Sequence, residues 1–285
     1  MGEEHTTLDI RDLTRQDYEL IRRLVYQKSG INLGDHKMQL VRARLGKRIR
    51  QGGFRSYREY FNHVARDSTG AELAQLLDAI TTNTTHLFRE MNHFVLLRKI
   101  VTAWVDDRNW RRANSMLRIW SAACSSGEEP HSIAMVAHSA VQAAPGLALK
   151  ILATDLSRKV LARAKTALYD IHRVGTVPAE YKHRYLKKVS CDGQPMFQVS
   201  REIRDVITFA RFNLMSPTFD FRHGFDIIFC RNVMIYFDRP TQETLVNKMA
   251  RHLRPGGYLI VGHSESLSAL HHPLTYVEPT VYRKE

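Results

Sequence analysis

The most informative part of the sequence is Arg118-Ile-Trp-Ser-Ala-Ala-Cys-Ser-Ser-Gly-Glu-Glu-Pro-His-Ser-Ile133. It predicts a buried strand, a short loop with a single glycine, and a helix whose first turn carries two glutamates and a proline. Such a turn leaves backbone N–H groups unpaired beside a pocket at the carboxyl end of the strand. A second apolar strand over 149–154 ends in Asp155, from which a carboxylate can accept both hydroxyls of a ribose. Together the two patterns predict an α/β domain that binds a nucleoside.

Length and composition indicate a soluble globular protein whose 285 residues form one large domain or two ordinary ones. The sequence has no apolar run of roughly 18 residues, so we expect no transmembrane helix, and its polar start is unlike a secretory signal. Three widely spaced cysteines argue against a disulfide framework or a zinc site. We therefore expect a reducing cytoplasm and no metal. The formal net charge of +13 predicts a negatively charged partner: nucleic acid, an anionic membrane surface or an acidic protein.

The first hundred residues show the periodicity of helices. Thr14 and Ser56 are predicted N-caps, each with an acidic residue three positions later. We predict helices from Thr14 to Gly30, from Asp35 to Arg50, from Ser56 through Val64, from Glu72 to the polar cluster Thr81–Thr85, and from His86 to Val105. The polar cluster is an expected loop, and 108–114 is an expected polar connection.

From Leu117 on, strands alternate with helices, which is typical of a parallel sheet with crossover helices. We predict strands at 117–122, 149–154, 206–212, 225–230 and 258–262, and helices near 129–141, 157–167 and 241–253. Between 169 and 207 the alternation breaks, because two strand-like runs flank Asp192-Gly193. A type I′ turn needs positive φ at both central residues, so this dipeptide predicts a small antiparallel β insertion. An irregular long loop is the alternative.

The predicted pocket lacks the sequence of a phosphate site. It has neither a G-x-G-x-x-G nor a G-x-x-x-x-G-K-[ST] pattern, so a pyrophosphate would meet carboxylates instead of several bare amides. A cationic nucleoside without phosphate fits better, which favours S-adenosylmethionine over NAD. Glu129 would then hold the α-amino group, Asp155 the ribose and Arg89 the carboxylate of the methionine tail.

Six motifs follow one another from the helical region almost to the C-terminus: ITTNTTHLFRE (80–90), WSAACSSGEEP (120–130), ATD (153–155), FNL (212–214), FDIIFCRNVMIYF (225–237) and PGGYLIVGHSE (255–265). In these motifs and their spacing the chain resembles the chemotaxis receptor methyltransferases, the CheR family, which esterify glutamate side chains of bacterial chemoreceptors. The resemblance implies a class I, Rossmann-like S-adenosylmethionine-dependent methyltransferase domain over 115–285 with a small antiparallel β insertion at about 170–205. A helical domain over 1–90 would precede it, with a connecting helix over 91–114.

The resemblance also implies roles for single residues. The cofactor, which leaves as S-adenosylhomocysteine, would be bound by Asn83, Thr85, Arg89, Glu129, Asp155, Asn213, Leu214, Arg231 and Asn232. Asn213 and Leu214 would lie at the adenine. Arg89 and Tyr236 would stand nearest the transferred methyl group and act as the catalytic residues.

The basic second helix would contact the acidic helices of the receptor's cytoplasmic domain through Arg42, Arg44, Lys47 and Arg48. A merely solvated charged face is the alternative there, and no recognition-helix pattern supports nucleic acid. The β insertion would dock a receptor's C-terminal tail by strand addition. The enzyme would be cytoplasmic and recruited to membrane receptor arrays. Two other functions stay open at this point: an RNA methyltransferase on the same fold, and a non-catalytic module that senses the cofactor.

Overall fold

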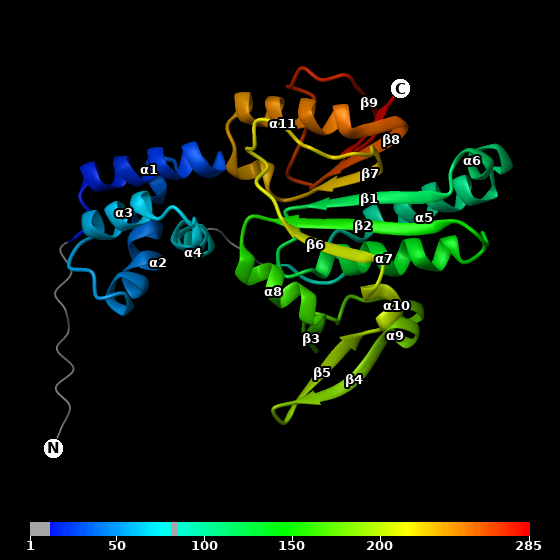
Figure 1. The fold of residues 1–285 in the computed structure, drawn as a ribbon, viewed down its shortest axis with the longest axis horizontal. Helices are drawn as coiled ribbons and strands as arrows, with labels where there is room; N and C mark the ends of the chain where they lie inside the picture. Colours follow the sequence, from blue (N-terminus) through cyan, green and yellow to red (C-terminus); the bar gives the residue numbers. More distant parts are fainter. Residues whose placement is uncertain (1–11, 81–84) are drawn as a thin grey trace. The chain divides into compact units, whose positions relative to one another are not determined.

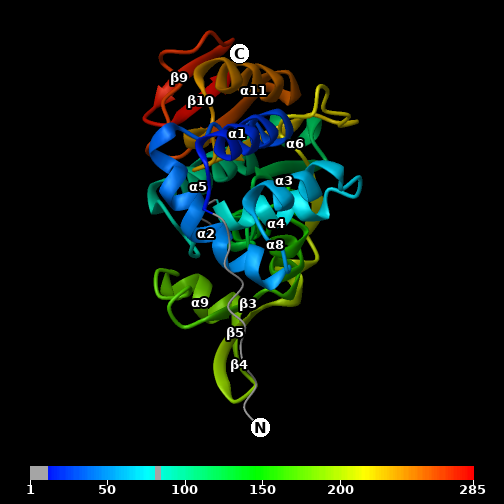
Figure 2. The same cartoon turned by 90° about the vertical axis from the view of Figure 1, so that its left-hand side faces the viewer.

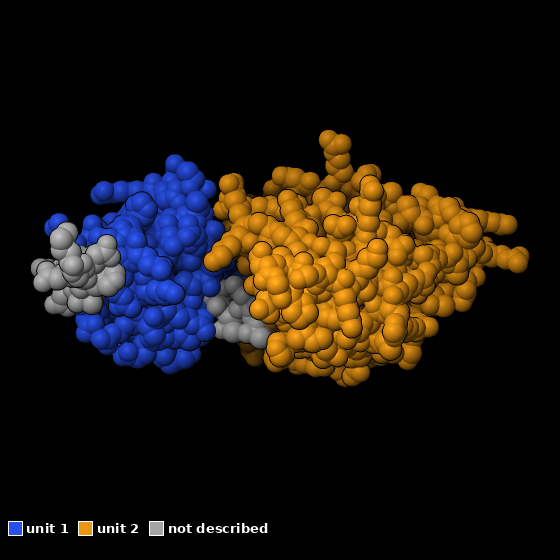
Figure 3. Space-filling model, turned by 90° about the horizontal axis from the view of Figure 1, so that it is seen from below, with its two compact units in different colours: residues 1–83, 236–238 blue, residues 84–235, 239–285 orange. Residues whose placement is uncertain are grey.

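The computed structural model describes residues 12–80 and 85–285, which fall into two compact units. Figure 3 colours the described residues of the helical unit, 12–80 and 236–238, blue, and those of the α/β unit, 85–235 and 239–285, orange. The expected domain limits at 90 and 114 stay predictions. Part of the expected polar loop, 81–84, lies outside the described residues.

The helical unit contains α1 (Arg15–Ser29), η1 (Asp35–Lys37), α2 (Met38–Gln51), α3 (Tyr57–Arg66) and α4 (Ala71–Ile80). Both predicted N-caps are confirmed: the hydroxyls of Thr14 and Ser56 accept the N–H groups of Asp17 and Glu59 at 3.1 and 3.2 Å. Gly30 ends α1 in the left-handed region at φ 73°. These caps fix the helix limits that the sequence predicts.

The helices of this unit bury one apolar face each. Their buried side chains include Tyr18, Ile21, Leu45, Ile49 and Tyr60. Between α2 and α4, which Figure 2 also shows together, the guanidinium of Arg48 forms a two-pronged ion pair with Glu72, with one N···O distance of 2.6 Å. A bidentate arginine–carboxylate pair holds its two elements in a fixed orientation.

The α/β unit is built on a seven-stranded sheet in the order β6-β2-β1-β7-β8-β10-β9. Its elements are α5 (Met91–Asp106), α6 (Arg108–Ala113), β1 (Met116–Ala122), α7 (Glu128–Val141), β2 (Ala148–Asp155), α8 (Arg158–Thr166), β6 (Ile207–Arg211), β7 (Phe225–Cys230), η2 (Met234–Tyr236, whose last residue belongs to the helical unit), α11 (Arg239–His252), β8 (Leu253–Val261), β9 (Leu274–Glu278) and β10 (Val281–Lys284). The first five strands of the order pair in parallel, as predicted. Every residue of β7 is buried, as expected for a central strand with both faces covered.

Three sequence-based expectations need correction here. The helix expected from His86 begins only at Met91, because Phe88 and Glu90 adopt positive φ angles of 58° and 60°. The expected polar connection 108–114 is the short helix α6, which Asp107 caps with its carboxylate. The sheet also ends in an antiparallel hairpin, β9 and β10, that the alternation pattern did not predict.

The predicted β insertion is confirmed as a second sheet. It contains β3 (Leu168–Asp170), β5 (Gln194–Val199) and β4 (Leu186–Cys191) in that order, with the short helices α9 (Ala179–Tyr185) and α10 (Arg201–Arg204) beside it. Asp192 and Gly193 form the hairpin turn with φ angles of 49° and 75°, both positive as a type I′ turn requires. Figures 1 and 2 both show β4 and β5 at the opposite end of this unit from α11.

The core of the α/β unit joins α5 and α7 to the central strands. Beside it, Trp120 is fully buried among four phenylalanine rings, and its indole N–H donates to Thr154 Oγ1 at 2.9 Å. This bond fastens β1 to β2 near their carboxyl ends. In the part of the chain that the structure describes, no helix combines the length and apolar character needed to cross a bilayer.

Candidate active site

The carboxyl ends of four neighbouring strands meet at one edge of the main sheet. Ala122 at the end of β1 pairs with Thr154 of β2 and with Cys230 of β7, and Cys230 pairs with Val261 of β8. The chain order reverses at β1, which has β2 on one side and β7 on the other. Open α/β sheets bind ligands at such a switch point. The residue after each strand end is therefore a candidate for ligand contact.

The loop after β1 is tightly wound around the end of β2. Ala123, Ser125 and Gly127 all have positive φ angles, of 61°, 49° and 92°. A Cβ on Gly127 would lie 2.8 Å from Ala164 Cβ, so only glycine fits the close approach to α8. The Ser125 N–H donates to Asp155 Oδ2 at 2.9 Å. The loop conformation thus directs a backbone N–H group to Asp155, the residue predicted to bind the ribose.

Asp155 ends β2 and is anchored from both sides. Besides Ser125, the Ser157 N–H donates to its Oδ1 at 2.9 Å. These two hydrogen bonds from backbone amides hold the plane of the carboxylate. The residue is only half-buried. Its placement suits the role that the sequence predicts for it.

The two acids at the start of α7 have different environments. Glu128 is fully buried and paired with Arg173 and Ser126 inside the unit, whereas the Glu129 side chain is 15% exposed. The Glu129 carboxylate accepts Ser121 Oγ–H at 2.7 Å. Of these two acids, only Glu129 lies at the strand-end edge. Burial raises the pKa of Glu129, although Arg231 and Ser121 act in the opposite direction.

Arg231, the first residue after β7, contacts Glu129, Glu90 and the backbone of Arg89. Its side chain is 1% exposed, and its guanidinium lies 3.2 Å from Glu129 Oε2 and 2.9 Å from Glu90 Oε2. It also donates to the carbonyl of Arg89. One buried cation therefore ties the end of β7 to the start of α7 and to the segment before α5.

Glu90 is a site residue that sequence reasoning missed. Its Oε1 accepts the Asn232 side-chain amide at 3.1 Å while its Oε2 binds Arg231. Burial pushes the pKa of Glu90 up, but Arg231 and Asn232 pull it below its ordinary value. The only signal in the sequence was its position next to Arg89 in the first motif.

The other predicted cofactor residues have the following places. Asn213 caps the turn after β6 by accepting the Met215 N–H at 3.0 Å, and the Leu214 carbonyl accepts from Lys248 Nζ at 3.0 Å. Thr85 and Arg89 lie in the irregular segment before α5, and both are partly exposed. Asn83 lies outside the described residues.

Tyr236 is assigned to the helical unit. Its carbonyl accepts the Asn32 N–H at 2.7 Å, and Lys37 Nζ lies 5.6 Å from the centre of its ring. The catalytic roles of Tyr236 and Arg89 stay predictions.

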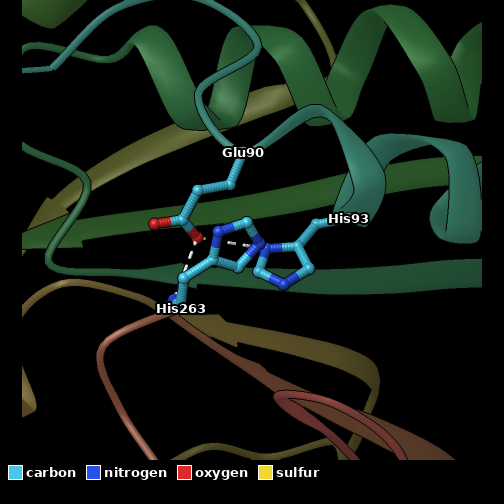
Figure 4. Close-up of side chains that lie close together, drawn as sticks. All are labelled: Glu90, His93 and His263. Carbon is cyan, nitrogen blue, oxygen red and sulfur yellow. Dashed lines mark hydrogen bonds and ion pairs between the residues drawn. The ribbon is translucent and has the colours of Figure 1, made fainter.

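Glu90, His93 and His263 form a group with the side-chain types of a metal site (Figure 4). Their ligand atoms lie within 4.8 Å of one another. However, both Glu90 oxygens already bind Arg231 and Asn232, and a divalent cation there would lie beside a guanidinium. Because Arg231 donates to the same Glu90 carboxylate, Coulomb repulsion between its guanidinium and a divalent cation would oppose metal binding. We therefore assign this group to the positioning of Arg231 and not to a metal.

Buried histidines predict a loss of stability in mild acid. Burial lowers the pKa of His131 to about 4, well below the 6.5 of the unfolded chain. Between these values the unfolded state binds a proton that the folded state does not, so stability falls as pH falls from about 6.5 to about 4. We expect His131→Gln to flatten this part of the pH profile of the unfolding free energy, while His223→Gln, an exposed control, leaves it unchanged. Parallel profiles of wild type and His131→Gln would refute the assignment.

The fold is Rossmann-like, with parallel strands in the order β6-β2-β1-β7-β8 and an antiparallel last hairpin. With the acids at the switch point and a helical domain before it, this fold defines the class of S-adenosylmethionine-dependent methyltransferases. Residues 83–283 match the family model described as CheR methyltransferase, SAM binding domain, and residues 16–81 match the CheR methyltransferase all-alpha domain. The chain belongs to the CheR methyltransferase family. The resemblance and the fold class expected from the sequence are thereby confirmed.

Relatives match over almost the whole chain. The chemotaxis protein methyltransferase of Borreliella burgdorferi is 37% identical over 96% of this chain and 95% of its own length. Chemotaxis protein methyltransferase 2 of Pseudomonas aeruginosa is 38% identical over 94% and 93%, and the Escherichia coli protein is 35% identical over 95% and 91%. A solved amino pentose methyltransferase from Micromonospora echinaspora aligns over 66% of this chain and 58% of its own with a TM-score of 0.35, too low to carry any argument.

Proposed function

We propose that this enzyme transfers the methyl group of S-adenosylmethionine to glutamate side chains of bacterial chemoreceptors. The products are glutamyl methyl esters and S-adenosylhomocysteine. The observation that carries the proposal is the set of anchored carboxylates and one buried arginine at the ends of β1, β2 and β7 in a chain of this family. Relatives named chemotaxis protein methyltransferase support the choice of receptor as substrate.

The charges of the site fit this cofactor. Burial disfavours the charged form of Glu129. An ammonium group from the methionine tail would stabilise the ionised carboxylate and so offset this effect. Asp155 would hold the ribose hydroxyls, and Asn213 with Leu214 would flank the adenine. Arg231 and Asn232 would close the tail pocket, together with Asn83, Thr85 and Arg89. S-adenosylmethionine supplies an electrophilic methyl group on a sulfonium.

The reaction makes modest demands on the protein. The acceptor carboxylate has an ordinary pKa of about 4.3, so it is already ionised at neutral pH and needs no general base. Catalysis then depends on orientation and on exclusion of water, which can lower a barrier by roughly 7–11 kcal/mol. We assign the orientation of the acceptor to Arg89 and Tyr236.

Receptor contact is proposed for the basic face of α2. Three of the four predicted residues have partners inside the helical unit: Arg48 pairs with Glu72, Arg44 donates to the Ile80 carbonyl at 3.0 Å, and Arg42 pairs with Asp12. Arg42 is exposed but lies 2.7 Å from Asp12. Lys47 is exposed, as is Arg50 one turn further along. The contact is therefore best tested at Lys47 and Arg50, where a change does not break the Arg48 pair.

Reversing Lys47 and Arg50 to glutamate should raise the KM for receptor about tenfold or more and reduce its dependence on salt. The KM should change because a positive surface speeds the encounter with acidic helices. At saturating receptor, kcat should stay nearly the same. Steady-state kinetics at several ionic strengths measure both effects. Reversal of the exposed Lys159 and Lys165 on α8 is the matched control. Equal effects from the two pairs would leave α2 no special role.

The β insertion has an edge strand that suits tail docking. β4 lies at the edge of its sheet, and five of its six residues are exposed. We propose that a receptor tail adds to this edge as a further strand. Calorimetric titration with receptor tail peptides tests this, and an absence of binding would mark the enzyme as tail-independent. The enzyme would work on the cytoplasmic side of receptor arrays.

The acceptor class can be tested with labelled cofactor. Incubation with methyl-tritiated S-adenosylmethionine and receptor membranes should give label that alkali releases as methanol, because methyl esters are base-labile. Total RNA in place of membranes should stay unlabelled. Label on RNA would favour the nucleic-acid alternative, and binding of cofactor without any labelled acceptor would favour a sensor.

A further inference from the structure

Glu265 lies in a nest of backbone amides next to the candidate site. Its Oε1 accepts the N–H groups of Val233, Met234 and Ile235 at 2.9, 2.7 and 3.3 Å. Its Oε2 accepts those of Asn232 and Gly262 at 2.8 and 2.6 Å. The residue is 6% exposed. Successive amides that converge in this way form a binding site for an anion, and here the anion belongs to the chain itself.

The partners of this carboxylate are amides and not cations. In residues 12–80 and 85–285, no lysine, arginine or histidine forms an ion pair with Glu265. The four consecutive donors 232–235 belong to the turn after β7, which starts with Asn232 at a positive φ of 58°. Of these four bonds, the one from Met234 is buried and the other three are partly buried. Without the two carboxylate oxygens, these N–H groups would lose their acceptor.

The backbone around the nest leaves no spare room. A Cβ on Gly262 would lie 2.6 Å from Asn232 Nδ2 and 2.8 Å from Glu265 Oε2. Next to it, the His263 N–H donates to Glu90 Oε2 at 3.3 Å. The loop after β8 and the turn after β7 thus both donate hydrogen bonds to Glu90. Glu265 connects the same two segments by accepting from Asn232 and Gly262.

We propose that Glu265 is a positioning residue for methyl transfer. It fixes the turn that presents Arg231 to Glu129 and the Asn232 amide to Glu90, and it acts on the cofactor only through them. This inference rests on the proposed function, because it concerns the pocket of the cofactor's tail. It assigns a role to the end of the last motif, PGGYLIVGHSE at 255–265, to which the sequence-based roles gave no residue.

Glu265→Gln tests the role of the charge with almost no change of shape. Its amide nitrogen cannot accept, so the two or three N–H groups facing it lose their acceptor. We expect the Kd for S-adenosylhomocysteine to rise about tenfold or more, kcat/KM to fall at least as much, and amides 232–235 to exchange hydrogen faster. Glu265→Asp keeps the charge and should recover part of both losses. Glu278→Gln, on the exposed edge strand β9, is the matched control.

The outcomes separate positioning from a purely structural role. Faster exchange at 232–235 with unchanged Kd and kcat/KM would overturn the proposal, as would normal exchange in Glu265→Gln. If Glu265→Gln does not fold, Glu265→Asp carries the same readouts, because a retracted carboxylate also strains these bonds. If the wild type and Glu278→Gln bind no S-adenosylhomocysteine, the proposed function fails, while hydrogen exchange still decides whether Glu265 holds the turn.

Discussion

Asp155→Ala should weaken the binding of S-adenosylhomocysteine by about 100-fold or more. The carboxylate is held by the amides of Ser125 and Ser157, both at 2.9 Å, so it is already oriented for the ribose. Hydrogen bonds to a charged group contribute about 1.5–3 kcal/mol each, and the substitution removes two of them from the proposed complex. Calorimetric titration measures the effect directly.

The control for this substitution is Asp220→Ala, which removes an exposed acid from the loop between β6 and β7. It should bind the product as the wild type does. Melting temperatures of both variants separate lost binding from lost folding. An unchanged Kd in a folded Asp155→Ala variant would remove Asp155 from the site.

Arg231→Met should destabilise the protein by about 3–5 kcal/mol and abolish measurable cofactor binding. The change leaves the largely buried carboxylates of Glu90 and Glu129 without their shared cation, and removing one partner of a buried ion pair has a cost of that size. Denaturant unfolding gives the stability. Methionine keeps much of the arginine's volume, so the loss reports on charge more than on packing.

A second substitution distinguishes the electrostatic cause from a cavity. Glu129→Gln in the Arg231→Met background removes one unpaired charge, so it should restore part of the lost stability but not the binding. Arg222→Met, at an exposed position, should change neither. A double variant no more stable than Arg231→Met would contradict the pairing described above.

Local signals in the sequence predicted most of the fold. The caps at Thr14 and Ser56 and the turn at Asp192-Gly193 are confirmed because each depends on bonds within a few residues. The helix start at 86 was wrong for the opposite reason. The positive φ angles of Phe88 and Glu90 go with contacts to Ser132 and Arg231, which are distant in sequence. Helix propensity cannot anticipate such contacts.

The site residues also fall into those that a local pattern predicts and those that depend on contacts distant in the sequence. The strand ends revealed Glu129 and Asp155, since a parallel sheet brings those positions to one edge. The sequence placed both Glu128 and Glu129 at the loop but assigned the cofactor contact to Glu129 alone, and in the structure Glu128 is the one that is fully buried. Successive helix residues point about 100° apart, so one enters the core and the other faces the edge. Glu90 and Glu265 have partners far along the chain, which no pattern in one sequence connects.

Charge on α2 shows a further limit of sequence reasoning. The sequence presents its arginines as equivalent, but Arg48 and Glu72 are 24 residues apart and meet only in the folded unit. An internal ion pair of this kind removes a residue from the surface that a partner can use. The remaining exposed cations define the face that the kinetic test addresses.

Mass spectrometry of the acceptor detects methyl-ester formation on receptor glutamates without any intermediate assay. Receptor incubated with the enzyme and S-adenosylmethionine should gain one CH2 group at individual glutamates of its cytoplasmic helices, and mild alkali should reverse the gain. The Arg231→Met variant should give none. Methylation at any other residue type, or a modification that survives alkali, would contradict methyl-ester formation on receptor glutamates.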